Sequence, residues 1–206
     1  MVFHRNSLPM KVMSWLADML HIQVLWIAYT IAGLVVGGFF PATFAMFAVM
    51  REMIHKSPDF SFHKKFKSEY RANFIKSNKL GYTLVIVAIA LVFYFRMTIN
   101  LDGSWAVLFV FLGYGAIILA LLSLLYVPVV FAHFDLSISQ ILRHALIIMI
   151  ASPVQSLANV VIVILFGVLT QELPALTPFI SFAMFSYGIT YFAYRAFNRL
   201  SERQKV

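Results

Sequence analysis

The sequence has no cysteine, and only 12% of its 206 residues are charged. The absence of cysteine excludes disulfides, thiolate metal sites and a cysteine nucleophile. Soluble domains carry about 25% charged residues, so this scarcity of charge excludes an ordinary soluble enzyme. Hydrophobic residues take the place of charged ones and make up 62% of the chain.

Signatures of catalysis and of metal or nucleotide binding are missing as well. The sequence holds neither the spaced histidines of a zinc site nor the glycine-rich loop of a nucleotide site. Acid–base catalysis and proton coupling use paired carboxylates, whereas Asp18, Asp102, Asp135 and Glu172 each lie at the end of an apolar stretch. We therefore expect no catalytic residues, no metal, no cofactor and no enzymatic activity.

Long apolar runs dominate what is present. Crossing a hydrocarbon core of about 30 Å takes about 20 helical residues. Runs without any charged residue extend over 19–50, 80–95, 103–134, 144–171 and 173–194. This pattern predicts an all-α, polytopic transmembrane helix bundle that forms one integral membrane domain over residues 1–206. The expected spans lie near 15–38, 80–99, 104–130, 143–170 and 175–196.

The net charge of +8 is concentrated in a few segments. Eight of the 16 Lys and Arg residues lie between 51 and 79, and the C-terminal tail is also basic. Basic residues gather at the cytoplasmic ends of membrane spans, so this charge predicts topology and gives no reason to expect a nucleic acid partner. We expect a multi-pass protein of the cell membrane, with segment 51–79 and the C-terminus in the cytoplasm and the N-terminus outside.

The first apolar stretch, residues 14–55, leaves two arrangements open. Gly37, Gly38 and Pro41 lie in its middle, where a helix bends or turns back. If the chain turns back there, in a re-entrant or six-crossing arrangement, the N-terminus lies inside with Arg5 and Lys11. Two full crossings need about 40 residues and the run is shorter, so we expect one bent span.

A cytoplasmic amphipathic helix is predicted near residues 58–78. Ser57-Pro58-Asp59 is typical of a helix start, and aromatic residues then recur every four positions. We expect this helix to lie on the membrane, with its aromatic stripe in lipid and its basic residues against anionic lipid of the inner leaflet. Docking on another protein is the alternative. The residues of this surface helix are Phe62, Phe66, Tyr70, Phe74, Lys64, Lys65, Lys67 and Arg71.

The deepest polar side chains share one face of a single predicted span. Ser152, Gln155, Ser156 and Asn159 are spaced three and four apart, beside Pro153. Hydrogen bonding between helices is the simpler interpretation of such a face. A path for a solute is the alternative.

Two stretches, Gly37–Arg51 and Phe66–Gly81, resemble the YesL-like family of small bacterial integral membrane proteins. The first carries a Pro-Ala-x-x-Ala block that ends in arginine, and the second is a basic, Phe-rich segment that closes in Asn-x-x-Gly. A tryptophan often found before the basic segment is absent here. The matching residues are Pro41, Ala42, Ala45, Arg51, Phe66, Phe74, Asn78 and Gly81.

The resemblance implies a role in sugar uptake, because members of this family tend to be encoded with carbohydrate ABC importers. We accordingly expect a non-enzymatic accessory subunit of an importer for oligosaccharides of the maltodextrin type. It would pack against the permease subunits and, through them, act with the ATPase and the sugar-binding protein. The expected partner-binding residues are Pro41, Ala42, Arg51, Phe66, Phe74, Asn78 and Gly81. A small autonomous solute transporter is the alternative.

Overall fold

The protein is described by a computed structural model over residues 8–55, 61–99, 103–175 and 181–203. Within these ranges the regular secondary structure is helical throughout, which confirms the all-α fold class. Among the helices described there, four are long and apolar enough to cross a membrane: Pro9–Ala32, Phe74–Thr98, Val107–His133 and Pro153–Glu172. The chain is therefore a membrane protein with multiple spans.

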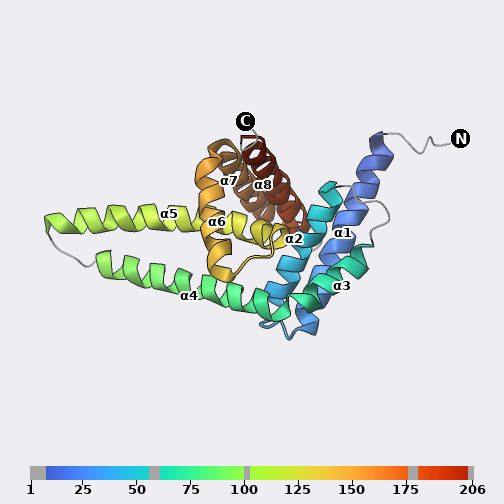
Figure 1. The fold of residues 1–206 in the computed structure, drawn as a ribbon, viewed down its shortest axis with the longest axis horizontal. Coiled ribbons are helices and arrows are strands. Elements are labelled where there is room, and N and C mark those ends of the chain that lie inside the picture. Colours follow the sequence, from blue (N-terminus) through green and yellow to red (C-terminus); the bar gives the residue numbers. More distant parts are fainter. Residues whose placement is uncertain (1–7, 56–60, 100–102, 176–180, 204–206) are drawn as a thin grey trace, which may run out of the picture.

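The first apolar run forms a helical hairpin. α1 (Leu8–Ala32) and α2 (Phe39–His55) lie side by side and are joined by a turn at residues 33–38 (Figure 1). Gly33 and Gly38 meet so closely that a Cβ on either would overlap the backbone of the other. Leu34 and Val35 complete the reversal with left-handed φ angles of 59° and 62°. The expectation of one bent span over 15–38 is corrected here, because the chain turns back on itself.

The predicted amphipathic helix near 58–78 is divided between two elements. α3 (Phe62–Ala72) ends at Asn73, whose φ of −106° and ψ of 10° leave the helical region. α4 (Phe74–Ile99) then begins and contains the predicted span 80–99. Residues 56–60, with the expected helix start at Ser57-Pro58-Asp59, lie outside the described residues.

The remaining predicted spans match helices with one correction. α5 (Ser104–His133) contains the span 104–130. The span 143–170 is broken into α6 (Ile138–Ala151) and α7 (Pro153–Glu172), because Pro153 lacks an N–H and Ser152 leaves the helical conformation. α8 (Phe182–Arg203) covers most of 175–196, of which 176–180 lie outside the described residues.

α2 is the central helix, because both apolar cores of the described chain use it. One core joins α1, α2, α3 and the start of α8 and includes Met19, Met46 and Phe66. The other joins α2 to α4, α5, α6 and α8 and includes Tyr126 and Ile141. α4 and α5 continue beyond these cores as a pair of helices that project from the rest of the molecule (Figure 1). We call residues 84–99 and 104–124 the α4–α5 arm.

Candidate functional site

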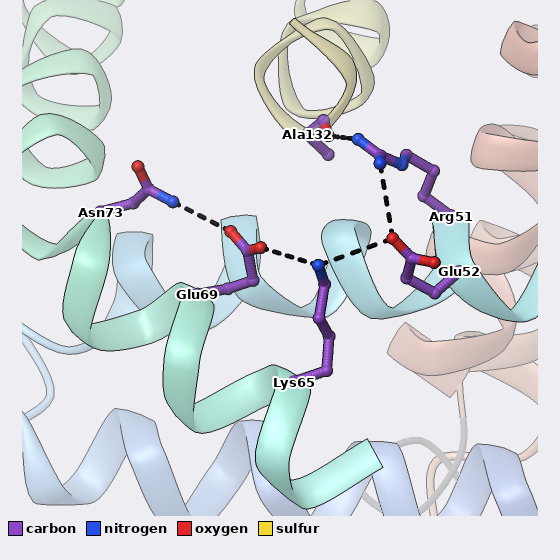
Figure 2. Close-up of polar contacts among 6 residues, drawn as sticks. All are labelled: Arg51, Glu52, Lys65, Glu69, Asn73 and Ala132. Carbon is purple, nitrogen blue, oxygen red and sulfur yellow. Dashed lines mark hydrogen bonds and ion pairs between the residues drawn. The ribbon is translucent and has the colours of Figure 1, made fainter. Parts of the chain in front are cut away.

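Charged side chains of α2 and α3 form a connected network (Figure 2). Lys65 of α3 places its Nζ 3.5 Å from Oε1 of Glu52 on α2 and 3.1 Å from Oε1 of Glu69 on its own helix. The amide of Asn73 donates a further hydrogen bond of 2.9 Å to Glu69. The network therefore holds α3 against α2 and satisfies Glu69 beside the break at Asn73.

Arg51 extends this network to α5. Its guanidinium donates a hydrogen bond to the carbonyl oxygen of Ala132 and lies 3.4 Å from Oε1 of Glu52. The side chains of Arg51 and Glu52 are 30% and 18% exposed, and exposed ion pairs contribute about 0.2–1 kcal/mol each. Their main effect is positional, because together they tie α2, α3 and α5 to one another.

The turn between α1 and α2 is held from outside by α4. The side-chain amide of Asn78 donates a hydrogen bond of 2.9 Å to the carbonyl oxygen of Gly37. One turn further along α4, the hydroxyl of Tyr82 donates a hydrogen bond of 3.1 Å to the carbonyl oxygen of Val36. These bonds satisfy backbone groups that the reversal leaves without helical partners.

Tyr70 of α3 holds the end of α1 in the same way. Its hydroxyl donates a hydrogen bond of 3.1 Å to the carbonyl oxygen of Tyr29, and the two rings lie 4.9 Å apart between centroids. Burial raises the pKa of Tyr70 above its usual range, and the neighbouring Tyr29 raises it further. Tyr70 therefore stays a neutral hydrogen-bond donor at physiological pH.

A further ion pair joins α4 to the connection after α5. Nζ of Lys76 lies 2.7 Å from Oδ1 of Asp135, and the same ammonium stands 5.5 Å from the ring centroid of Phe131. The hydrogen bond and the charge of Lys76 hold the pKa of the Asp135 carboxyl below its usual range. The two residues are 59 positions apart in the chain, so neither spacing nor periodicity in the sequence indicates this pair.

The polar face predicted on one span is the inward face of α7. Ser152, Gln155, Ser156 and Asn159 are all buried. In a continuous helix the carbonyl of Met149 would accept from the N–H of the residue four places on, which is Pro153 and has none. The hydroxyl of Ser156 donates to that carbonyl instead, at 2.9 Å.

Tyr126 of α5 completes the arrangement around the break. Its hydroxyl lies 2.9 Å from Oγ of Ser156. Because the single proton of Ser156 is used on Met149, Tyr126 is the donor in this pair. Ser156 thus repairs the break between α6 and α7 and fastens it to α5. The side-chain nitrogen and oxygen of the buried Asn159 have no hydrogen-bond partner among the described residues, so hydrogen bonding between helices by the whole face stays a prediction.

The expected partner-binding residues lie mostly inside the described chain. Arg51 belongs to the network with Glu52, and Asn78 bonds the turn. Gly81 lies directly against the ring of Phe40, so closely that a Cβ would overlap it. The residues that are buried are Pro41, Ala42, Phe66 and Gly81, and those that are partly exposed are Arg51, Phe74 and Asn78. Their contacts are therefore with this chain, and their binding to a partner stays a prediction.

The aromatic stripe expected in lipid packs on protein instead. Phe66 is fully buried and Tyr70 nearly so, and both rings contact Tyr29 of α1. Phe62 and Phe74 are partly buried at the two ends of the stripe. The basic residues of α3 have different environments. Lys65 belongs to the charged network, whereas the other three are exposed, namely Lys64, Lys67 and Arg71. Contact of these residues with anionic lipid stays a prediction.

Two further features bear on chemistry. Among the described residues, no three His, Asp or Glu side chains are grouped so as to hold a metal ion.

A groove of about 520 Å³ runs between the α4–α5 arm and α6. Its lining is aliphatic apart from Ser123 and includes the small residues Ala88, Ala116 and Ala120. Such a surface suits the close approach of apolar groups rather than the binding of a polar substrate.

Comparison with known proteins places the chain in a family. Residues 19–95, which hold the second part of α1, all of α2 and α3 and most of α4, match the family described as "Protein of unknown function, DUF624". The chain is 35% identical over 199 residues to "Uncharacterized protein YesL" of Bacillus subtilis (strain 168), with 93% of this chain and 90% of that protein covered. It is 27% identical over 189 residues to "Uncharacterized protein YteU" of the same organism, with 89% and 83% covered. No solved structure matches the chain. The protein therefore belongs to the YesL-like family.

Proposed function

We propose that the protein is a non-enzymatic accessory membrane subunit of a carbohydrate ABC importer, which packs against the permease subunits and supports their assembly or transport. The observation that carries this proposal is the α4–α5 arm. Its side chains are predominantly apolar, and many of them are exposed, such as Ile86, Phe93 and Phe111. The arm thus offers helix surface that the rest of the described chain does not cover.

Membrane helices associate by close packing, because lipid tails are as apolar as the side chains that meet them. The groove between the arm and α6 provides a concave surface for this purpose, with Ala88, Ala116 and Ala120 in its lining. We propose that a permease helix lies in this groove. The arm is anchored at its base by the pairs Asn78–Gly37 and Arg51–Ala132, so a docked helix would meet a fixed surface.

The orientation in the cell membrane is part of the same proposal. We place the network around Lys65 and the exposed cations Lys64, Lys67 and Arg71 on the cytoplasmic side, together with the C-terminus, because basic residues gather there. The cations would contact anionic lipid of the inner leaflet. Sugar as the cargo follows from the YesL-like resemblance, and the energy for uptake would come from the partner ATPase.

Affinity purification in mild detergent tests the proposal. Cells grown on an oligosaccharide should yield the tagged protein together with importer subunits. Ala88→Phe fills the groove and should reduce this copurification, whereas Ala90→Phe, an exposed position on the same helix outside the groove lining, should not. A monodisperse protein without any transporter subunit would contradict the proposal. Sugar uptake by liposomes that contain this protein alone would support the autonomous transporter instead.

A further inference from the structure

Both ends of α2 are bonded to the segment that runs from α3 into the start of α4. At its C-terminal end, Glu52 lies 3.5 Å from Lys65 of α3. At its N-terminal end, the turn before α2 accepts the hydrogen bond from Asn78, which follows α3 closely in the chain. α3 therefore runs alongside part of α2, and the start of α4 reaches the turn before α2.

The outer face of this segment, from α3 to the start of α4, is cationic. Lys64, Lys67 and Arg71 of α3 and Lys79 of α4 are exposed, and charged side chains are excluded from the hydrocarbon of a bilayer. The face that they form must therefore lie in water or among headgroups. One end of α2 is bonded to Lys65 of α3, and the turn at its other end is bonded to Asn78 of α4, next to the exposed Lys79. Neither end of α2 therefore lies on the far side of the membrane from these cations.

α1 also runs beside α3. The ring of His21 lies 5.8 Å from that of Phe62 at the start of α3, and the ring of Tyr29 lies 4.9 Å from that of Tyr70 near its end. The segment of α1 between His21 and Tyr29 thus shares the depth of the cationic helix. Length and apolar composition alone would make α1 a span, but its neighbour does not allow a crossing at this segment.

The apolar residues of α1 form an exposed surface that is not explained by a membrane crossing. Met13, Leu20, Val24 and Ile31 form one exposed stripe along the outer face of α1. The stripe continues into the turn, where Leu34, Val35 and Val36 are 86%, 55% and 69% exposed. These three exposed aliphatic residues are consecutive, and the backbone of Leu34 and Val35 is in the strained left-handed conformation. An exposed apolar patch of this kind indicates an interaction surface.

The position of the turn indicates what covers it. Val36 is bonded to Tyr82, and Tyr82 begins the exposed apolar face of α4 that continues through Ile86 and Ile89. The turn is therefore continuous with the face by which α4 enters the hydrocarbon. Lys79, one turn earlier on α4, marks the level of the headgroups.

We infer that α1, α2 and α3 form a unit that lies at one surface of the bilayer without crossing it. The stripe of α1 and the turn at residues 33–38 are immersed in the outer part of a single leaflet. The partner of this surface is the lipid leaflet itself, with apolar chains against the turn and anionic headgroups against the cations of α3. This inference does not depend on the importer proposal.

The lack of cysteine makes a direct test practical, because each introduced cysteine is the only thiol. Val36→Cys and Val24→Cys, both at exposed positions, are labelled with bimane in full-length protein. The protein is then reconstituted in vesicles of phosphatidylcholine and phosphatidylglycerol. The lipids carry bromine either near the headgroup or near the end of the acyl chains. Ser68→Cys on the exposed face of α3 and Ile89→Cys on the arm serve as aqueous and deep controls.

We expect the probes at positions 36 and 24 to be quenched more by the shallow bromine than by the deep one, the probe at 89 to show the reverse, and the probe at 68 to be quenched least. Stronger quenching of the position 36 probe by the deep bromine would overturn the inference, as would no quenching at all. In cells, labelling of Val36→Cys by an impermeant maleimide from the side opposite Ser68→Cys would show a crossing hairpin and would also overturn it.

Discussion

Ser156 donates its hydroxyl hydrogen to the carbonyl oxygen of Met149, at 2.9 Å, and so replaces the backbone donor that Pro153 cannot supply. Tyr126 in turn donates to Ser156. The break between α6 and α7 is therefore a satisfied structure. The hydroxyl groups of Ser156 and Tyr126 are both used inside the protein.

This arrangement predicts an order of effects. Ser156→Ala leaves both the Tyr126 hydroxyl and the Met149 carbonyl without partners and should lower the free energy of unfolding by about 1–3 kcal/mol. Tyr126→Phe leaves only one acceptor position of the Ser156 hydroxyl unused, so it should lower the free energy of unfolding by less than Ser156→Ala does. Unfolding in mixed detergent micelles measures both. An equal or reversed order would show that the donor assignment is incorrect.

Asn78 is expected to hold the turn between α1 and α2. Asn78→Ala removes the donor to Gly37 and should lower the free energy of unfolding by about 1 kcal/mol. Thr83→Ala is the matched control, because the hydroxyl of Thr83 bonds only within its own helix, to Lys79. Equal effects of the two substitutions in the same unfolding assay would argue against a special role for Asn78.

Gly81 is expected to be required for the approach of α4 to α2. A methyl group at Gly81 would overlap the ring of Phe40, and overpacking of this kind costs about 1–3 kcal/mol. Gly81→Ala should therefore lower the midpoint of thermal unfolding. Phe40→Leu should relieve the overlap, so the double variant should be more stable than the sum of the single effects predicts. Strict additivity would exclude the contact.

Arg51 is expected to act through the shape of its guanidinium as well as its charge. One Lys ammonium is a poor replacement, because Arg51 reaches Ala132 and Glu52 from two nitrogens in a fixed geometry. Arg51→Lys should lower the free energy of unfolding by about 1–2 kcal/mol. Arg143→Lys, at an exposed position of α6, should change it little. Similar losses for both would indicate a general effect of lysine.

The pair Lys76–Asp135 predicts a dependence on pH. Lys76 lowers the pKa of Asp135 in the folded protein below the ordinary 3.8, so the pair stabilises the folded state above pH 3.8. That contribution is lost as the pH falls through the lower, folded pKa. Asp135→Asn should remove this step from the pH profile of stability, and high salt should weaken it. An unchanged acid limb in the variant would contradict the assignment.

The sequence allowed the helical elements to be predicted better than their pairing. The polar face of α7 was visible from the spacing of Ser152, Gln155, Ser156 and Asn159, and its burial follows from the cost of polar groups in lipid. The hairpin at Gly33 and Gly38 is not predicted, because the apolar run is too short for two crossings. The length rule presumes that each helix crosses the membrane, whereas the two ends of α2 are bonded to Lys65 of α3 and Asn78 of α4 beside it.

The aromatic stripe of α3 shows a second limit. Periodicity identified Phe66 and Tyr70 as one apolar face, but it does not distinguish lipid from protein as the surface that covers this face. Tyr29 of α1 supplies the covering surface here. The bonds from Asn78 to Gly37, Arg51 to Ala132 and Lys76 to Asp135 join distant parts of the chain, and single-sequence patterns carry no signal for such pairs.

The break at Asn73 has a mechanical consequence. Because α4 starts immediately after α3 and α5 ends beside Arg51, both roots of the α4–α5 arm are fixed to the unit formed by α1, α2 and α3. A sideways displacement of the arm in the bilayer therefore also moves the cationic face of α3, because only Asn73 separates α3 from α4.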